Sequence, residues 1–273
     1  MSTTNSLKRL IGAFAMAAMM AGAGIGAAHA ETVLISGANR GLGLGFARAY
    51  ADRGWTVIAT ARNPDEAADL KALMAKNKNV SVEKLDVSDE ASINALAAKL
   101  KGKPIDLLLN NAAVNDGNGK GTVLGSFDAK FFDLEMRTNV LGPLLMSQAF
   151  LPNVEAGKLK KIVSITSPSA VISRPMKKET RRAHTYFYRS SKSALNMAMK
   201  ILSAEVRERG VTVGIVHPGG VDTEMLRSVF DGKPQTQAQK PDDAALKIVA
   251  VIDTLTMENV DQVWGYDGKV IPW

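Results

Sequence analysis

The sequence contains no cysteine, and this absence excludes disulfides, thiol nucleophiles and thiolate metal sites together. Aromatic residues make up only 5% of the chain, and the basic residues are scattered along it. Proteins that bind nucleic acid usually gather lysine and arginine beside aromatic platforms, so the composition argues against that class despite a formal net charge of +7. The histidines, aspartates and glutamates form no group with convincing metal-ligand spacing, so we expect no metal.

The first 30 residues have the three parts of a secretory signal. Lys8 and Arg9 form a basic start, the stretch from Leu10 to about Gly26 is apolar or small, and Ala28-His29-Ala30 supplies small residues for cleavage. A membrane span needs about 20 well-packed apolar residues, and this stretch is shorter and rich in glycine and alanine. We therefore expect a cleaved signal over residues 1–30, export to the periplasm and no stable membrane span afterwards. The alternative is a tether in the inner membrane.

Residues 31–273 carry no Pro/Gly/Ser-rich linker, repeat or low-complexity tract, so we expect one domain there. Short runs rich in Val, Ile and Leu alternate with longer segments of helical period. The expected strands are 32–36, 55–60, 80–85, 105–109, 161–165 and 211–216, and the expected helices include 42–53, 89–100, 188–209 and 241–255. Because parallel strands need crossover helices, this alternation predicts an α/β, Rossmann-like, doubly wound parallel sheet of about seven strands with helices on both faces.

A glycine-rich segment follows the first expected strand and leads into an apolar helix. It reads Ser36-Gly37-Ala38-Asn39-Arg40-Gly41-Leu42-Gly43. Glycines let the backbone turn tightly, and the free N–H groups at a helix start, aided by the helix dipole, can hold a pyrophosphate. The spacing alone is weak, but its place between a strand and a helix predicts a dinucleotide phosphate loop.

The end of the second expected strand indicates which dinucleotide binds. Sites of this kind that take NAD carry an acidic residue there, which binds the ribose 2′-hydroxyl. Here the strand end reads Ala59-Thr60-Ala61-Arg62 and offers no carboxylate. Arg62, together with Arg40 in the glycine loop, instead offers two guanidinium groups for a 2′-phosphate. We expect the two to flank one pocket, which favours NADP(H).

Tyr188 and Lys192 are four residues apart in an expected helix, so their side chains lie on one face, one turn apart. A free tyrosine titrates near pH ~10 and is a poor acid–base catalyst at neutral pH unless nearby positive charge stabilises its phenolate. Lys192 can supply that charge. A Tyr and a Lys at this spacing are common on helices, so the pair gains its meaning from the motifs that accompany it.

Those motifs occur in a fixed order. They are the glycine loop, Asn110-Asn111-Ala112-Ala113, Asn139, Ser167, Tyr188-Arg189-Ser190-Ser191-Lys192 and Pro218-Gly219. In this order they resemble the short-chain dehydrogenase/reductases over nearly all of residues 31–273. The text around Tyr188 and the ending Asp267-Gly268-Lys269-Val270-Ile271-Pro272-Trp273 resemble the sniffer-type carbonyl reductases and C-factor-like proteins.

The resemblance implies an NADPH-dependent oxidoreductase that reduces an aldehyde or a ketone to an alcohol, or runs the reverse reaction. Tyr188 would exchange a proton with the substrate oxygen. Lys192 would lower the pKa of Tyr188 and hold the nicotinamide ribose. Ser167 would hydrogen-bond the substrate oxygen, and Asn139 would hold a water that links Lys192 to solvent. The alternative is a nucleotide-binding signalling protein of C-factor type with little turnover.

The resemblance further implies the cofactor contacts and a homodimer or homotetramer, formed through the long helix that starts at Tyr188. Asp86 and Val87 would flank the adenine, and the Thr223 hydroxyl would lie near the carboxamide or a phosphate. The full set implied to contact the cofactor is Gly37, Asn39, Arg40, Gly41, Leu42, Gly43, Arg62, Asp86, Val87, Asn110, Ala112, Tyr188, Lys192, Pro218, Gly219, Val221 and Thr223.

The interval from Ser167 to Tyr188 is markedly longer than in many members of the family. It leaves three alternatives for the catalytic serine, namely Ser164, Ser169 and Ser173. The extra length also contains a basic run, which we expect to loop over the substrate entrance and to favour anionic carbonyl compounds. Its basic residues are Lys177, Lys178, Arg181 and Arg182. His217, at another strand end, is expected to be structural.

Overall fold

Eight strands form one sheet in the computed structural model, which describes residues 30–115, 121–174 and 185–273. Their spatial order is β3-β2-β1-β4-β5-β6-β7-β8, and only the last pair, β7 and β8, is antiparallel. The strands are β1 (Thr32–Ile35), β2 (Thr56–Ala61), β3 (Val80–Lys84), β4 (Leu107–Asn110), β5 (Lys161–Ile165), β6 (Thr212–His217), β7 (Val263–Gly265) and β8 (Val270–Ile271). The expected α/β fold is confirmed, with the two-residue β8 added to the expected sheet. The expected signal lies outside the described residues, apart from Ala30.

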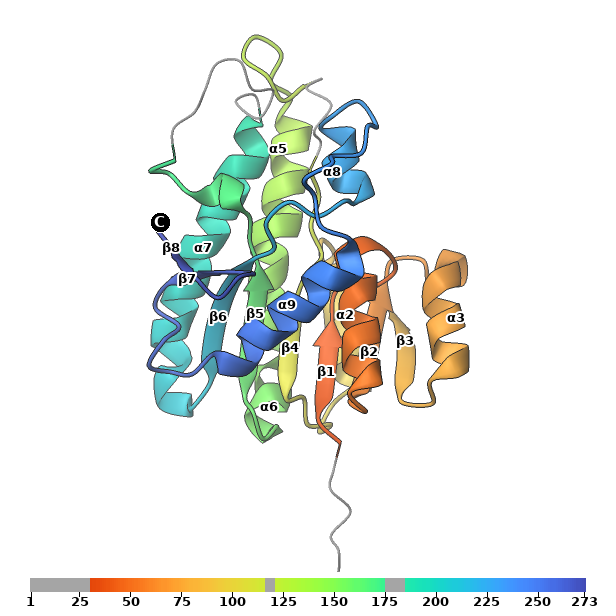
Figure 1. Cartoon of the computed structure of the whole chain (residues 1–273). Coiled ribbons are helices and arrows are strands. Elements are labelled where there is room, and N and C mark those ends of the chain that lie inside the picture. The colour runs from red at the N-terminus through yellow and green to blue at the C-terminus, as the bar shows by residue number, and fades with distance from the viewer. Residues whose placement is uncertain (1–29, 116–120, 175–184) are drawn as a thin grey trace, which may run out of the picture. The chain divides into compact units, whose positions relative to one another are not determined.

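Helices cover both faces of this sheet (Figure 1). One face carries α2 (Gly41–Asp52), α3 (Ala68–Lys76) and α9 (Pro241–Thr254), and the other carries α4 (Glu90–Lys99), α6 (Gly142–Ala156) and α7 (Tyr186–Val206). The remaining helices are α5 (Ala129–Met136) and α8 (Glu224–Ser228), and a π-helical turn, η2 (Arg137–Leu141), joins α5 to α6. None of the helices within the described ranges is both long and apolar enough to cross a membrane.

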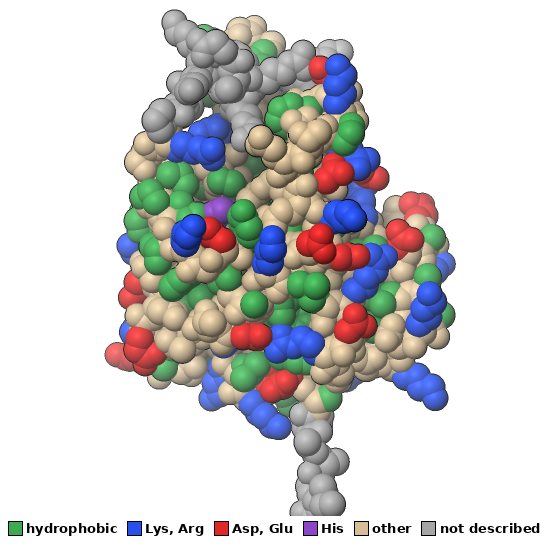
Figure 2. Space-filling model, viewed as in Figure 1, with side chains coloured by type: hydrophobic (Ala, Val, Ile, Leu, Met, Phe, Trp, Pro, Cys, Tyr) green, Lys and Arg blue, Asp and Glu red, His purple; other side chains and the backbone are tan. Residues whose placement is uncertain are grey.

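The central strands β1, β4, β5 and β6 are buried on both faces, which explains why their sequences are mostly hydrophobic. In β1, for example, Val33 and Ile35 join the core beneath α2 and α9, whereas Leu34 joins the core beneath α4, α6 and α7. The outer faces of α2 and α9 are joined by exposed ion pairs from Arg48 to Asp242 and from Arg53 to Asp253. Figure 2 shows basic and acidic side chains interspersed over this face of the molecule, without a large patch of one sign.

The sheet brings the sequence motifs to one edge. The glycine loop follows β1, Asn110 ends β4, Ser167 follows β5 and Pro218 follows β6. Strand order reverses between β1 and β4, because the chain builds outwards from β1 to β3 in one direction and from β4 to β8 in the other. In open α/β sheets, ligands bind outside the carboxyl ends of the strands at such a reversal. The motifs surround that point.

Candidate active site

The glycine loop is held in a shape that only glycine permits at its tightest positions. Gly37 and Gly41 have φ of +66° and +54°, in the left-handed region that side chains disfavour. A Cβ on Gly43 would overlap the carbonyl oxygen of Gly37, so the start of α2 lies directly against the loop. Its free N–H groups are therefore presented at the sheet edge, as a phosphate cradle requires.

The segment after β4 clamps this loop. The Ser36 hydroxyl accepts the N–H groups of Asn111 and Ala112, at 3.0 and 3.1 Å. The Asn111 amide in turn donates to the carbonyls of Ser36 and Gly37, each at 3.0 Å. Ala112 lies so close that a Cβ on Gly37 would come within 3.0 Å of it. The hydroxyl at position 36 thus joins two motifs that are distant in sequence.

Asn110 supports the fit of a ligand at this edge. Its side chain is buried, and its amide nitrogen lies 3.4 Å from the Ser164 hydroxyl. Its amide oxygen is buried and has no hydrogen-bond partner among the described residues. Together with the glycine cradle, this free acceptor fits a dinucleotide placed across the reversal point.

The two arginines expected to share one pocket have different surroundings in the structure. Arg40 forms an exposed ion pair with Glu224 of α8. Arg62 instead lines an open groove of about 920 Å³ at the ends of β2 and β3, beside Lys84 and Asp86, and Arg40 is not among the lining residues. In this structure the two arginines therefore do not line one groove, and a 2′-phosphate site shared by both stays a prediction. Glu224, the partner of Arg40, lies in the first turn of α8.

Asp86 and Val87 follow β3, and Asp86 lines that groove together with Arg62. Asp86 Oδ1 accepts the N–H and the hydroxyl of Ser88, at 2.9 and 2.7 Å, so it shapes a turn. Asp89, rather than Asp86, caps α4 by accepting the N–H of Ala91 at 3.0 Å. Val87 is buried, and its carbonyl lies against Gly142 at the start of α6.

The segment after β6 meets the glycine loop from the other side. Gly219 has φ of +71° and lies against the Tyr266 ring. The Thr223 side chain lies beside Gly41, and its hydroxyl caps α8 by accepting the N–H of Leu226 at 3.2 Å. Pro218 offers its carbonyl to Gln239, and Val221 packs into the core with only its backbone at the edge. Asn39 is half-buried, and Leu42 is buried in the same core.

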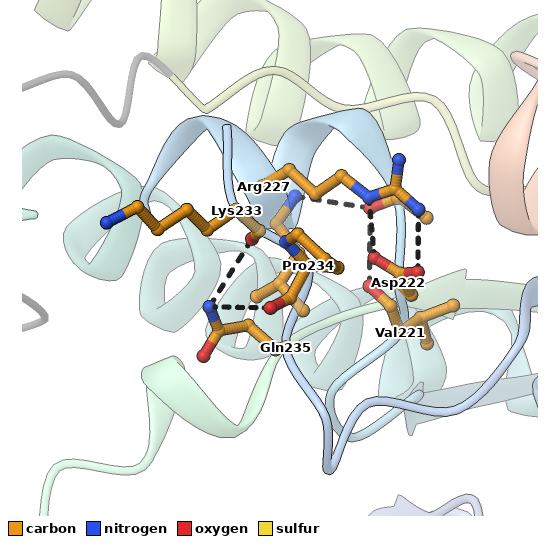
Figure 3. Close-up of polar contacts among 8 residues, drawn as sticks. Val221, Asp222, Arg227, Lys233, Pro234 and Gln235 are labelled. Carbon is orange, nitrogen blue, oxygen red and sulfur yellow. Dashed lines mark hydrogen bonds and ion pairs between the residues drawn. The ribbon is translucent and has the colours of Figure 1, made fainter. Parts of the chain in front are cut away.

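An ion pair between Arg227 and Asp222 holds the segment that contains α8 (Figure 3). Arg227 donates from Nε and Nη2 to the two carboxylate oxygens of Asp222, at 2.7 Å each. Figure 3 also shows Gln235 contacting the carbonyls of Lys233 and Pro234. These contacts are exposed and add little stability, but they order the loop beside Thr223.

His217, just before Pro218, is buried, and its Nδ1 accepts the N–H of Gly219 at 3.0 Å. Burial lowers its pKa to about 4, the charge of Asp267 raises it and that of Arg174 lowers it. The imidazole is therefore neutral at physiological pH and holds the turn, in agreement with the structural role expected for it.

At the sheet edge, Ser167 lies close enough to Tyr188 for its hydroxyl to lower the pKa of the Tyr188 phenol. The structure thus favours Ser167 over the three alternative serines. Ser164 is buried beside Asn110, Ser169 offers its N–H to Ser167 at 3.1 Å, and the Ser173 hydroxyl bonds the Trp273 carbonyl at 3.4 Å. The basic run that fills the long interval lies outside the described residues, so its expected place over the entrance stays a prediction.

Lys192 is almost fully buried one turn along α7 from Tyr188. Its Nζ donates to the Ile165 carbonyl at 2.9 Å and lies 5.9 Å from the centre of the Tyr188 ring. Burial lowers the pKa of Lys192 to about 8. The pKa of Tyr188 is raised to about 12, again chiefly by burial, while the Ser167 hydroxyl lowers it and the charge of Glu135 raises it. This direction is opposite to the expected lowering, because desolvation is the largest of these effects.

Asn139 is fully buried within η2. Its side chain accepts the N–H of Val114 and donates to the Val114 carbonyl, both at 2.8 Å, and donates to the Ser191 hydroxyl at 3.0 Å. Both amide hydrogens are thus used to join the segment after β4 to α7. The expected water would have to be held by the remaining lone pair or by the π-helical backbone, where bulges often occur at functional sites.

Sequence reasoning missed one residue of this site. Glu135 of α5 is only 1% exposed, and its charge acts on both Tyr188 and Lys192. The signal available in the sequence was an acidic residue on the apolar face of an amphipathic helix. Acidic residues are almost never fully buried without a partner or a function. Among the described residues, no group of three His, Cys, Asp or Glu side chains could hold a metal.

Comparison with known proteins places this geometry in a family. The model of the short chain dehydrogenase family matches residues 31–234. The chain is 34% identical over 255 residues to an uncharacterized oxidoreductase of Schizosaccharomyces pombe, covering 88% of this chain and 96% of that protein. It is 32% identical over 181 residues to the C-signal protein of Myxococcus xanthus, covering 66% of this chain and all of that protein.

Two solved structures are similar over their entire length. The NADPH-bound carbonyl reductase from chicken fatty liver is 31% identical with a TM-score of 0.79, and covers 90% of this chain. The carbonyl reductase Sniffer of D. melanogaster is 25% identical with a TM-score of 0.78, and also covers 90% of this chain. The resemblance to sniffer-type reductases and C-factor-like proteins is confirmed. This chain therefore belongs to the short-chain dehydrogenase/reductase family.

Proposed function

We propose that this protein is an NADPH-dependent oxidoreductase that reduces the carbonyl group of an aldehyde or a ketone, or runs the reverse reaction. The observation that carries the proposal is the Tyr188 phenol, with the Ser167 hydroxyl close enough to act on its pKa and Lys192 one turn away, beside the glycine cradle. The NADPH-bound carbonyl reductase of similar fold supports the cofactor and the reaction class.

Each residue of the site has a task in this reaction. When bound, the reduced cofactor supplies a hydride to the carbonyl carbon. The Ser167 hydroxyl hydrogen-bonds the carbonyl oxygen, where negative charge develops. Tyr188 donates its phenolic proton to that oxygen, and a phenol of high pKa holds this proton across the neutral range. Lys192 places positive charge beside the resulting phenolate. Arg62 and Lys84 line the groove in which a 2′-phosphate would be held.

The test is oxidation of NADPH by the purified protein with a panel of small aldehydes and ketones. We expect faster turnover with NADPH than with NADH. Tyr188→Phe should lower kcat by roughly 10²–10⁴-fold, the usual contribution of a general acid. Tyr186→Phe is the matched control, because Tyr186 is an exposed tyrosine in the same helix turn whose ring contact with Phe127 survives the change. A preference for NADH, or full activity in Tyr188→Phe, would contradict the proposal.

The similarity to the C-signal protein supplies the second candidate, a nucleotide-binding signalling protein with little turnover. Tight binding of NADPH without reduction of any carbonyl in the panel would favour it. The buried Lys192 beside Tyr188 favours the enzyme, because a protein that only binds the nucleotide has no need of a proton donor.

We also propose that residues 1–30 are a cleaved signal and that the protein is exported. The support is the order of basic start, apolar stretch and small cleavage residues. Fractionation followed by N-terminal sequencing tests this, with Glu31 as the expected first residue of a periplasmic form. An intact Met1 form in the membrane would favour the inner-membrane tether instead.

The oligomeric proposal is a homodimer or homotetramer that uses α7. Met197 and Ile201 lie one turn apart on α7, and they are 59% and 60% exposed. Large apolar side chains left in water on one helix stripe suit a contact with a second copy. Light scattering on the wild type and on Ile201→Asp tests it, and a wild-type monomer would exclude it.

A further inference from the structure

Glu135 lies on the face of α5 that packs against α7. The Phe132 ring contacts the Phe187 ring edge-on, with centroids 5.4 Å apart, and Asn139 donates to Ser191 at 3.0 Å. Glu135 is three residues after Phe132 and four before Asn139, so the three share one stripe. The carboxyl group therefore faces α7 between the levels of these two contacts.

Tyr188 and Lys192 lie next to these two contacts along α7. Each directly follows one of the contacted residues, since Phe187 precedes Tyr188 and Ser191 precedes Lys192. The carboxyl group of Glu135 is 1% exposed, and Lys192 is 3% exposed, so their interaction takes place out of water. Charge interactions are much stronger there than at the surface.

Charge effects agree with this placement. The negative charge of Glu135 raises the pKa of Lys192 and that of Tyr188. Within the described ranges, Glu135 is the one charged group that acts on either residue, and the other side chain involved is the neutral Ser167 hydroxyl. Burial alone would favour a neutral amine at Lys192, and a carboxylate at this place favours the ammonium.

The packing between α5 and α7 does not itself require a carboxyl group. Phe132 of α5 contacts Phe187 of α7 at 5.4 Å between ring centres, and Phe127, just before α5, contacts the same ring at 5.3 Å. An apolar side chain would fill the same place without the desolvation cost of an acid, which amounts to several kcal/mol in a protein interior. What distinguishes Glu135 from an apolar side chain at this place is the charge that it brings beside Lys192 and Tyr188.

We propose that Glu135 is a positioning residue that keeps Lys192 in its ammonium form and Tyr188 in its phenol form at neutral pH. This inference rests on the proposed carbonyl reduction, in which the phenol is the proton donor and the ammonium stabilises the phenolate. Carbonyl reduction starts from a phenol at Tyr188 and an ammonium at Lys192, and these are the two protonation states that Glu135 favours.

The first experiment measures the charge of Lys192 without turnover. Protein labelled with 13C at the lysine Cε is titrated by NMR, and Lys192→Met identifies the resonance. We expect a midpoint near pH 8 in the wild type. In Glu135→Gln the midpoint should fall by about one pH unit, since a buried charge partner shifts a pKa by one unit or more. Glu135→Asp keeps the charge, so its midpoint should return most of the way to that of the wild type.

The second experiment follows the pH profile of carbonyl reduction. In Glu135→Gln the alkaline fall of kcat/KM should move to lower pH by the same amount as the NMR midpoint. Thermal unfolding checks that both variants are folded. An unchanged midpoint in a folded Glu135→Gln protein would overturn the inference. A shifted midpoint in a protein whose wild type reduces no carbonyl would support the charge effect of Glu135 and overturn the proposed function.

Discussion

At the scale of single residues, burial decides the chemistry of the site more than sequence spacing does. The four-residue interval from Tyr188 to Lys192 places both side chains on one face of α7, as the pattern predicts. Desolvation then moves the two pKa values in opposite directions, to about 12 for the phenol and about 8 for the amine. The pair is thus poised for donating a proton from tyrosine rather than for holding a phenolate.

Substitution of Arg62 tests the preference for NADPH over NADH. If its guanidinium meets a 2′-phosphate in the groove beside Lys84, Arg62→Ala should raise the KM for NADPH by roughly tenfold or more, since a charge-assisted hydrogen bond contributes about 1.5–3 kcal/mol. The KM for NADH should stay the same. Arg40→Ala is the control, because Arg40 is paired with Glu224 outside that groove, and we expect a smaller change. Equal changes for both cofactors in Arg62→Ala would contradict this assignment.

The lowered pKa of His217 predicts how the stability of the fold depends on pH. Its pKa falls from 6.5 to about 4 on folding, chiefly because of burial. Between these values the unfolded chain binds more protons, so the folded state loses stability as pH falls from 6.5 to 4, by at most about 1.4 kcal/mol per pH unit. Above pH 6.5 the effect is absent, since both states are neutral.

Urea unfolding at a series of pH values measures this effect. Carboxyl groups also titrate in this window, so the wild type is compared with His217→Asn, whose Oδ1 can accept the Gly219 N–H in place of Nδ1. We expect the variant to lose less stability on acidification. Parallel curves for the two proteins would show that His217 is not responsible.

At the scale of elements, the π-helical turn η2 links the segment after β4 to α7. Asn139→Ala removes three hydrogen bonds and leaves polar groups of Val114 without partners. We expect a loss of about 1–3 kcal/mol in the free energy of unfolding, together with a fall in kcat, because Ser191 lies next to Lys192.

A second buried asparagine provides the control for Asn139. Asn153→Ala removes bonds to the carbonyls of Leu100 and Lys103, at 2.7 and 2.8 Å, on the opposite edge of the sheet from the site. It should lower stability by a similar amount and leave kcat unchanged. If both variants lose stability but neither loses kcat, η2 holds the fold and has no part in catalysis.

At the scale of the whole molecule, the close packing of α2 on α9 joins the start of the domain to its end. A Cβ on Gly45 would lie 2.9 Å from the Pro241 carbonyl oxygen and 3.0 Å from the Ala245 Cβ. Helix propensity alone favours Gly45→Ala by about 1 kcal/mol, but the overlap with backbone should cost about 1–3 kcal/mol. We expect net destabilisation and a lower Tm for the entire domain. A stabilised variant would show that the two helices can move apart freely.

Much of the fold follows from local pattern. The Val/Ile/Leu runs form strands within about two residues of their expected bounds, because buried parallel strands leave a signal that needs no tertiary contact to read. The short β7 and β8 and the helices α3, α5 and α8 carry weaker patterns. They form where the rest of the sheet and the site loops hold them.

The sequence by itself determined the order of motifs at the strand ends, the glycine cradle and the Tyr188–Lys192 pair, since each depends on neighbours within one turn or one loop. Only the tertiary structure decided which serine meets Tyr188, which arginine lines the groove and that Glu135 lies beside the catalytic pair. These outcomes depend on side chains from distant segments meeting out of water, where desolvation and charge are set by all the surrounding elements at once.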